Sequence, residues 1–219
     1  MALKNEVDVV FLDAGGVLFD TFIKQYDRIR NLLTARGCPQ SHIDTALVKA
    51  KAYVREFLTE NSLITNWDEE EQYYKGLYGV IAKELGEMGL INELFYCTHY
   101  AVHCELFPEV KEVLETLRHR YRLGVISNAL PSMDWVFDRF GIRKYFDAII
   151  LSATVKVAKP DAAIYHIALQ RLQAEKAHCI FIDDKLENIE GAERVGIRGL
   201  RLDREKMNLL ELLKGHGLL

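Results

Sequence analysis

The stretch VDVVFLDAGG, residues 7–16, decides the fold of this chain of 219 residues. Its first part is a short, mostly apolar run rich in Val, which is typical of a buried strand in a parallel sheet. The run ends at Asp13, and the glycines that follow indicate a loop at the carboxyl end of the strand. A carboxylate in that position is costly unless it has a task. Asp13 is therefore the first candidate site residue.

Apolar runs of the same kind recur in the second half of the chain, and segments with helical periodicity separate them. They are Leu123–Ile126, Ala148–Leu151, Cys179–Ile182 and Gly199–Leu202. Five strands that alternate with helices predict an α/β fold with a doubly wound parallel sheet.

Residues 21–104 show a different pattern, with amphipathic helices and no strand between them. The expected buried stripes are Tyr26, Ile29 and Leu33, then Ile43, Leu47, Ala50, Val54 and Phe57, then Tyr74, Leu77, Tyr78, Ile81 and Leu85. Gly37 is expected to end the first helix, Ser41 to cap the second and Asn66 to start the third. We therefore predict a Rossmann-like core domain of residues 1–20 and 105–219, with an inserted all-helical cap domain of residues 21–104.

Composition excludes several classes of function. The 28 basic and 32 acidic residues leave a formal charge of −4, which is too balanced for sequence-independent binding of nucleic acid. No apolar run approaches the ~20 residues that span a bilayer, and the run that ends at Asp13 is not a signal peptide. The four cysteines form no C-x-x-C pair, so we expect reduced thiols and a cytoplasmic location. The oligomeric state cannot be predicted from these features.

Polar side chains follow the predicted strands at the edge of the sheet where ligands bind in open parallel sheets. Ser127 and Asn128 follow the second strand, and Lys159 begins the helix after the third. Asp183 and Asp184 follow the fourth strand. Turn and capping chemistry would explain each of these separately, but we expect all of them to converge with Asp13.

Four ordered segments carry a resemblance that covers nearly the whole chain: FLDAGGVLFD from Phe11, VISNA from Val125, KPDAAIY from Lys159 and FIDDKLENIEGA from Phe181. The chain resembles haloacid dehalogenase superfamily hydrolases with a helical cap. Its motif wording is similar to that of bacterial sugar-1-phosphate phosphatases and of the phosphatase domain of soluble epoxide hydrolases. The resemblance implies a Mg²⁺-dependent phosphatase that acts on a small phosphorylated metabolite.

The resemblance also implies roles for the acidic and basic residues. Asp13 would attack phosphorus and form an aspartyl-phosphate, and Lys159 would supply positive charge. Asp13, the Gly15 carbonyl, Asp183 and Asp184 would bind Mg²⁺, which prefers hard oxygen ligands. A carboxylate that attacks a phosphate dianion needs a divalent cation and a cationic side chain at the same place, so these residue types fit that chemistry.

The remaining site residues are expected to hold the phosphoryl group or to support the others. Ser127, Asn128 and the backbone N–H groups up to Gly16 would bind phosphoryl oxygens. Asn188 would orient Lys159 or a metal ligand, although it is equally explained as an exposed helix residue.

Gly15 departs from the family's usual pattern, because phosphatases of this type usually carry a second aspartate there as general acid. A general acid typically contributes about 10²- to 10⁴-fold to the rate. One explanation is a phosphatase for anomeric or acyl phosphates, whose leaving groups depart easily, or one that takes its acid from the cap. The alternatives are a haloacid dehalogenase, in which Asp13 attacks carbon without metal, and a catalytically silent ligand-binding protein.

Other polar and aromatic residues fit structural roles better than functional ones. His99 and His103 have the i, i+4 spacing of metal ligands on a helix, with Cys97 and Cys104 nearby, but Cys97 and His103 lie on different helix faces. A zinc site is therefore disfavoured. Trp67 and the tyrosines of the cap are expected in its core. We expect hinges for cap movement near Asp20 and near Phe107 and Pro108.

Overall fold

The computed structural model describes residues 7–60 and 63–219 of the chain. Contacts between residues divide it into two compact units. One unit holds the chain up to Asp20 together with Glu105–Leu219, and we call it the sheet unit. The other holds Thr21–Cys104, and we call it the helical unit.

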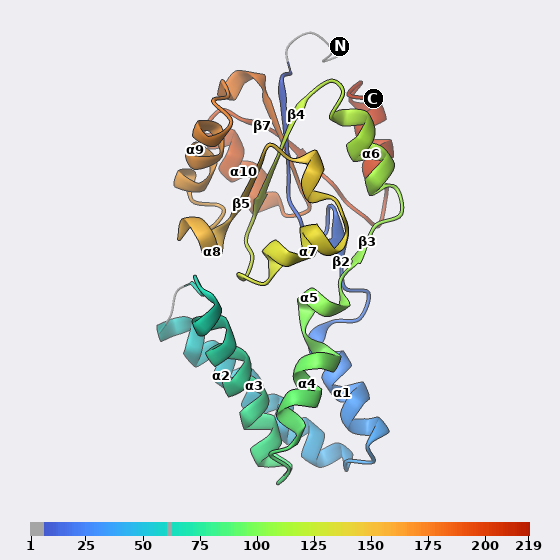
Figure 1. Ribbon diagram of the computed structural model, residues 1–219, viewed down its shortest axis with the longest axis vertical. Coiled ribbons are helices and arrows are strands. Elements are labelled where there is room, and N and C mark those ends of the chain that lie inside the picture. The colour runs from blue at the N-terminus through green and yellow to red at the C-terminus, as the bar shows by residue number, and fades with distance from the viewer. Residues whose placement is uncertain (1–6, 61–62) are drawn as a thin grey trace. The chain divides into compact units, whose positions relative to one another are not determined.

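The sheet unit is built on five parallel strands in the order β5-β4-β1-β6-β7 (Figure 1). The strands are β1 (Val9–Leu12), β4 (Arg122–Ser127), β5 (Ala148–Leu151), β6 (Cys179–Asp183) and β7 (Arg198–Arg201). The predicted doubly wound α/β sheet is therefore confirmed. The last strand lies one residue earlier than its apolar run predicts.

The order of the strands places a crevice at the carboxyl end of β1. The chain passes from β1 to β4 on one side and later returns to β6 on the other side. Binding crevices form where the winding direction reverses in this way. In the register of the sheet, Leu12 lies opposite both Val125 and Ile182. The residues just beyond these three positions therefore leave the sheet side by side.

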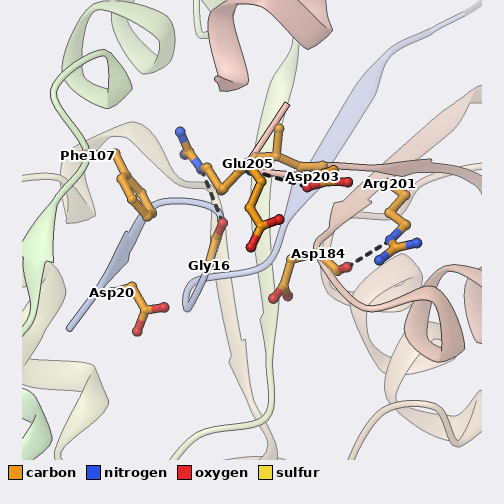
Figure 2. A pocket seen from close by; sticks show the side chains of 9 residues that line it. Gly16, Asp20, Phe107, Asp184, Arg201, Asp203 and Glu205 are labelled. Carbon is orange, nitrogen blue, oxygen red and sulfur yellow. Dashed lines mark hydrogen bonds between the residues drawn. The ribbon is translucent and has the colours of Figure 1, made fainter. Parts of the chain in front are cut away.

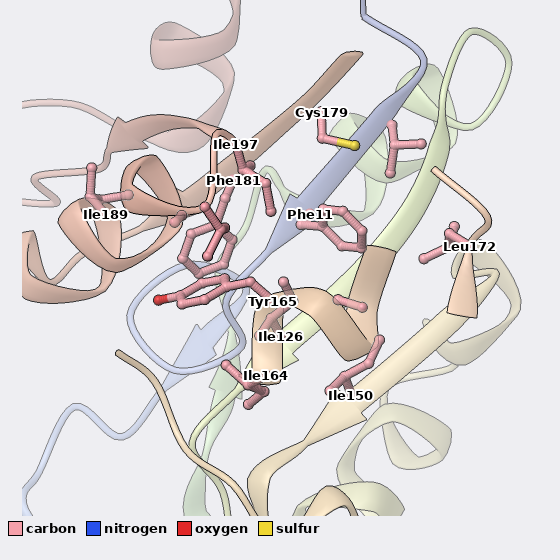
Figure 3. Packing of buried hydrophobic residues seen from close by; sticks show 14 residues of the cluster. Phe11, Ile126, Ile150, Ile164, Tyr165, Leu172, Cys179, Phe181, Ile189 and Ile197 are labelled. Atoms are coloured by element: carbon pink, nitrogen blue, oxygen red, sulfur yellow. The ribbon is translucent and has the colours of Figure 1, made fainter. Parts of the chain in front are cut away.

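Alternating side chains of the strands pack against helices on both faces of the sheet. On one face, Phe11 lies in a core cluster with side chains of α9 (Ala162–Arg171) and α10 (Leu186–Arg194), as Figure 3 shows. A Cβ atom at Gly124, the partner of Phe11 in β4, would lie 2.7 Å from the Phe11 ring. Glycine is therefore required at residue 124 to accommodate the ring.

Helix α6 (Val110–Leu117) lies on the opposite face and contacts α11 (Leu209–Gly215). The apolar residues on one face of α6, Val110, Val113, Leu114 and Leu117, are all fully buried. The other helical segments of the sheet unit are α7 (Met133–Arg139), α8 (Ser152–Val155) and the 3₁₀ turns Arg143–Tyr145 and Lys176–His178.

A short antiparallel pair joins the two places where the chain leaves and re-enters the sheet unit. Strand β2 (Phe19–Asp20) pairs with β3 (Glu105–Leu106). Phe19 is fully buried, and its ring meets the Phe137 ring edge to face at 5.7 Å. This anchor holds the ribbon firmly on the sheet unit.

The helical unit consists of helices only. They are α1 (Gln25–Ala35), α2 (Gln40–Glu60), α3 (Trp67–Glu84), α4 (Leu90–Thr98) and α5 (Tyr100–His103). α3 begins at the residue after Asn66, which confirms the predicted start, and the Asn66 side chain caps the helix by accepting a hydrogen bond from the Glu69 N–H. The prediction that Ser41 caps α2 is wrong, because the N–H groups of His42 and Ile43 bond to the Pro39 carbonyl and the helix begins before Ser41.

The inward stripes of the first three helices follow the predicted periodicity in their central turns. Buried members are Ile29, Leu33, Ile43, Leu47, Ala50, Tyr74, Leu77, Tyr78 and Ile81. Trp67 is 60% exposed, so the expectation that it lies in the core is wrong. Its place at the first position of α3 puts it beyond the buried stripe. None of the helices in the described part of the chain combines the length and the apolar composition needed to cross a membrane.

Candidate active site

Asp13 follows β1 directly, at the carboxyl end of the central strand of the sheet. Its side chain is nearly buried, and one carboxylate oxygen, Oδ1, accepts a hydrogen bond from the Ala14 N–H at 2.7 Å. Burial raises the pKa of Asp13 above its ordinary value, the nearby charge of Lys159 lowers it, and the charge of Asp183 raises it. A hydrogen bond with Ser127 lowers the pKa as well. A cation at this place would therefore favour the ionised carboxylate that a nucleophile needs.

Lys159 lies between two carboxylates that belong to different strands. Its Nζ atom is 2.9 Å from Oδ1 of Asp13 and 2.6 Å from Oδ2 of Asp183. Lys159 and Asp183 are almost completely buried, so each charge depends on the others for compensation. The structure thus brings together three predicted site residues that the sequence separates widely.

The carboxylate of Asp183 has its hydrogen-bonding capacity taken up. Asn188 Nδ2 lies 3.2 Å from Oδ1 and 3.0 Å from Oδ2, and the Lys185 N–H donates to Oδ1 at 2.8 Å. Lys159 takes the remaining direction. Asn188 is buried rather than exposed, so its place fits the expectation that it orients the residues around Lys159.

Asn128 fixes the backbone of Lys159 from the next strand. Its Nδ2 donates to the Lys159 carbonyl at 2.8 Å, and its Oδ1 accepts from the Lys159 N–H at 2.7 Å. One amide hydrogen of Asn128 remains for a ligand. Ser127 is buried at the end of β4, beside Asp13. These two neighbours therefore have different partners: Ser127 forms a hydrogen bond with Asp13, the candidate nucleophile, and Asn128 binds the backbone of Lys159.

The acidic residues fit a divalent cation. Among the described residues, Asp13, Asp183 and Asp184 form the one group of carboxylate, imidazole or thiol ligands close enough to share a metal ion, with ligand atoms within 4.8 Å of one another. Oδ1 of Asp184 is buried and has no hydrogen-bond partner. An unsatisfied carboxylate oxygen beside two other acids is the donor set that Mg²⁺ takes.

The loop after Asp13 presses against Asp184. Gly16 has φ +76°, and a Cβ atom there would lie 2.8 Å from both Cγ and Oδ2 of Asp184. Only glycine combines this backbone conformation with this close approach. Gly15 lies outside the positive-φ region and pairs as an isolated bridge with Phe19. A substitution at Gly16 therefore meets a backbone constraint, the positive φ angle, that a substitution at Gly15 does not meet.

A cavity of ≈ 370 Å³ opens beside Gly16 and Asp184, entirely within the sheet unit (Figure 2). Its further lining is mostly charged: Asp20, Phe107, Arg201, Leu202, Asp203, Arg204 and Glu205. Arg201 Nε donates to the Asp184 carbonyl at 3.1 Å. None of the residues after β7 belongs to a motif, so the sequence gives no signal for their place beside the site.

The cysteines and histidines near the end of the helical unit do not gather around a common point. His99 Nδ1 accepts from the Ala101 N–H at 3.1 Å, and His103 Nε2 lies 3.1 Å from the Tyr96 carbonyl oxygen. Cys97 is exposed and Cys104 is buried. No metal-binding group forms from these side chains in the described chain, and they serve local structure instead.

Comparisons with known proteins find similarity to hydrolases. A family model described as haloacid dehalogenase-like hydrolase matches residues 7–196. A glyceraldehyde 3-phosphate phosphatase of Methanothermobacter thermautotrophicus is 29% identical over 207 residues, which is 90% of this chain and 85% of that protein. An (S)-2-haloacid dehalogenase of a Pseudomonas species is 33% identical over 92 residues, 41% of this chain and 40% of that enzyme.

Solved structures support the fold. The haloacid dehalogenase-type phosphatase of Thermococcus onnurineus has a TM-score of 0.62 at 19% identity, and the match covers 96% of this chain and 98% of that one. At that level of identity the likeness concerns the fold alone. The resemblance that the four sequence motifs carry is confirmed by the family match.

Proposed function

The chain belongs to the haloacid dehalogenase-like hydrolases, and from that premise we propose that it is a magnesium-dependent phosphatase of a small phosphomonoester. The observation that carries the proposal is the buried Lys159 ammonium held between Asp13 and Asp183, with a free carboxylate oxygen of Asp184 beside them. Cation, nucleophile and metal ligands at one place are what attack on a phosphate dianion requires.

The reaction would proceed in two displacements at phosphorus. A carboxylate oxygen of Asp13 forms a bond to phosphorus, and the bond from phosphorus to the substrate oxygen breaks. The leaving group departs with that electron pair, and an alcohol takes up a proton from solvent, whereas an acyl group leaves as a carboxylate. Water then attacks phosphorus and gives up a proton to solvent, the bond between phosphorus and Asp13 breaks so that Asp13 leaves as a carboxylate, and inorganic phosphate is released. Lys159 and Ser127 keep the attacking carboxylate aligned throughout.

Asp13, Asp184 and the Gly15 carbonyl would hold Mg²⁺, with Asp183 close by. The ion, when bound, supplies Lewis-acid stabilisation of the charge on the phosphoryl oxygens. Asp183 is less suited to direct ligation, because Lys159, Asn188 and a backbone N–H already occupy its oxygens. In this proposal Asp183 mainly holds Lys159 in place.

The absence of a carboxylate at residue 15 limits the range of substrates that the proposed phosphatase can hydrolyse efficiently. Without a general acid at that position, an anomeric or acyl phosphate is the better substrate, because its leaving group needs less protonation. A relative named glyceraldehyde 3-phosphate phosphatase adds a primary phosphate ester to the candidates. A cytoplasmic location, a metabolite substrate and the lack of a nucleic-acid or membrane partner stay predictions.

A haloacid dehalogenase is the second candidate, since part of the chain is similar to an (S)-2-haloacid dehalogenase. That reaction forms an ester between Asp13 and a substrate carbon, expels halide and needs no metal. The dehalogenase reaction gives no role to the buried Asp184 oxygen that lacks a hydrogen-bond partner. The acidic group therefore favours the phosphatase.

The test is phosphate release from a panel of acetyl phosphate, hexose 1-phosphates, hexose 6-phosphates and glyceraldehyde 3-phosphate. Each substrate is measured with Mg²⁺ and with EDTA. Metal-dependent release that favours the acyl and anomeric phosphates supports the proposal. If no substrate of the panel releases phosphate and 2-chloropropionate releases chloride in EDTA, the dehalogenase function replaces the phosphatase proposal. If neither phosphate nor chloride is released, a ligand-binding protein without catalytic activity is favoured.

A further inference from the structure

Arg204 reaches the active-site loop from a distant part of the chain. It follows β7 by three residues, and its side chain is only 18% exposed. Its Nε donates to the Gly16 carbonyl at 3.2 Å, across a separation of 188 residues. The dashed line that ends at Gly16 in Figure 2 marks this bond.

Each of the three guanidinium nitrogens of Arg204 donates a hydrogen bond. Besides the bond to Gly16, Nη2 donates to the Val17 carbonyl and Nη1 forms an ion pair with Glu109. The Phe107 ring lies against its face, with the guanidinium carbon 3.7 Å from the ring centroid. A planar fork with five donors can satisfy this set, whereas an ammonium group cannot.

Within residues 7–60 and 63–219, no backbone N–H group donates to the Gly16 or Val17 carbonyl. Its N–H groups fold inward: those of Val17, Leu18 and Phe19 all lie near the Ala14 carbonyl, which accepts from them. The Gly16 and Val17 carbonyls point the other way and bond to Arg204. Buried carbonyls need such partners, so Arg204 completes the hydrogen bonding of the loop.

Glu109 holds Arg204 in turn. The same oxygen that pairs with Arg204 accepts the Leu209 N–H at 3.1 Å, at the start of α11. Burial raises the pKa of Glu109, but the hydrogen bonds from Arg204 and from the backbone outweigh it and keep the pKa below its ordinary value. Glu109 therefore stays ionised as the counter-charge of Arg204 over the working pH range.

What Arg204 fixes is the peptide that touches Asp184. A Cβ atom at Gly16 would lie 2.8 Å from the Asp184 carboxylate, so the chain passes close to that side chain, and the preceding carbonyl is that of Gly15. The Gly16 carbonyl belongs to the peptide between Gly16 and Val17, and the Gly15 carbonyl belongs to the adjoining peptide. If the loop shifted at Gly16, the chain beside Asp184 and the neighbouring Gly15 carbonyl would shift with it. Asp184 and the Gly15 carbonyl are metal-ligand candidates in the proposed function.

We infer that Arg204, supported by Glu109, is a positioning residue that sets the Gly15–Gly16 backbone against Asp184 and thereby preforms the cation site. The inference rests on the proposed function. Residues that orient metal ligands typically affect metal affinity or activity by about 10- to 100-fold when they are lost.

The experiment compares Arg204→Ala and Arg204→Lys with a matched control, Arg120→Ala. Arg120 also donates to a backbone carbonyl, that of Leu218 at 2.9 Å, and lies over an aromatic ring, that of Tyr121, but it has no contact with the active-site loop. Each protein is titrated with Mg²⁺ by calorimetry without substrate. kcat and KM are then measured at saturating Mg²⁺, with and without a low, non-denaturing concentration of guanidinium.

Arg204→Ala is expected to weaken Mg²⁺ binding and to lower kcat, each by about ten-fold or more, with little change in KM. Guanidinium should restore part of both, Arg204→Lys should fall between, and Arg120→Ala should match wild type. If Arg204→Ala fails to fold, Arg204→Lys alone decides by the same criterion.

Wild-type Mg²⁺ affinity and kcat in the Arg204 variants, even with a lowered Tm, would overturn the positioning role while the proposed function stands. A wild-type protein that neither binds Mg²⁺ nor releases phosphate would instead overturn the proposed function and this inference with it.

Discussion

The sheet unit and the helical unit both bury charged side chains, but they use them differently. In the sheet unit, Lys159 joins two acids and an unpaired oxygen of Asp184 remains beside them. In the helical unit, Arg28 is buried too, yet it donates to the carbonyls of Ile23 and Thr98 and so ties backbone segments together. The buried Arg28 guanidinium thus has backbone partners and fastens the fold, whereas Asp184 Oδ1 keeps the capacity to bind a ligand.

The aromatic side chains of the helical unit make the same point. His99 lies between the rings of Tyr74 and Phe95, with centroids at 4.3 Å and 4.7 Å, and its Nε2 is 3.5 Å from a carboxylate oxygen of Glu70. The Tyr78 hydroxyl accepts hydrogen bonds from Thr98 and Gln25. Tyr74 and Tyr78 serve packing and internal hydrogen bonding, whereas Tyr96 is 69% exposed and contradicts the expectation that the tyrosines of this unit lie in its core. Substitutions of the buried aromatic residues and of the acidic site should therefore separate stability from activity.

The largest expected effect is loss of the nucleophile. Asp13→Asn should lower phosphate release by at least about 1,000-fold, because an amide oxygen neither attacks phosphorus nor binds Mg²⁺ well. The fold should persist, as circular dichroism and the urea midpoint can show. If this variant still releases phosphate, Asp13 is not the nucleophile, and the proposed difference between a catalytic sheet unit and a structural helical unit is contradicted.

Lys159→Met should have the largest effect on stability. It leaves the carboxylates of Asp13 and Asp183 buried without a cation, which costs about 3–5 kcal/mol of the free energy of unfolding. Urea unfolding in EDTA measures this loss. Addition of Mg²⁺ should recover part of it, since the ion replaces the missing positive charge. A loss below about 1 kcal/mol would mean that the acids are less dependent on Lys159 than their burial indicates.

Gly16→Ala tests the close approach of the loop to Asp184. The added methyl group meets the carboxylate at 2.8 Å in a positive-φ backbone, which should cost about 1–3 kcal/mol of stability. kcat should fall as well, because the cation site is displaced. Gly15→Ala is the matched control: its backbone lies outside the positive-φ region, so it should keep most of its stability. Equal effects at both positions would contradict the distinction between the two glycines.

Tyr78→Phe probes the helical unit and should affect stability alone. The variant loses the hydroxyl that accepts from Thr98 and Gln25, a change of about 0.5–1.5 kcal/mol. kcat/KM should match wild type under conditions where the protein is folded. A fall in kcat/KM without a fall in the unfolding midpoint would assign this tyrosine to the substrate instead.

The thiols should show the smallest effect, a difference in accessibility. Cys97 is exposed, whereas Cys104 and Cys179 are buried, and burial raises the pKa of Cys179 to about 11. A thiol reagent should therefore label Cys97 in the native protein and reach the two buried cysteines only on unfolding. Rapid native labelling of Cys179 would show that the base of β6 opens readily.

The sequence predicts much of this architecture because parallel strands bring their carboxyl ends together. Asp13, Ser127 and Asp183 leave three neighbouring strands, so the topology alone makes them meet. The sequence does not distinguish Asp183 from Asp184, because the difference lies in which oxygens are hydrogen-bonded. That information exists only in three dimensions.

Arg204 and Glu109 could not be predicted for a related reason. Arg204 contacts the loop and Glu109 contacts Arg204, in both cases across a long stretch of the chain, and neither residue lies in a motif or on a periodic face. The capping role given to Ser41 failed because Pro39 supplies the first carbonyl of the helix, two residues earlier than side-chain preference indicates. In the first case long-range side-chain contacts decide the outcome, and in the second case a backbone hydrogen bond does.

The central claim is that Asp13 carries the phosphoryl group during turnover. The most direct measurement is an acid quench of the enzyme during steady-state hydrolysis of acetyl phosphate with Mg²⁺, followed by mass spectrometry of the peptide that contains Asp13. The account predicts the added mass of one phosphoryl group on Asp13, absent in EDTA and in Asp13→Asn. Turnover with no phosphorylated Asp13, or with the label on another residue, would contradict it.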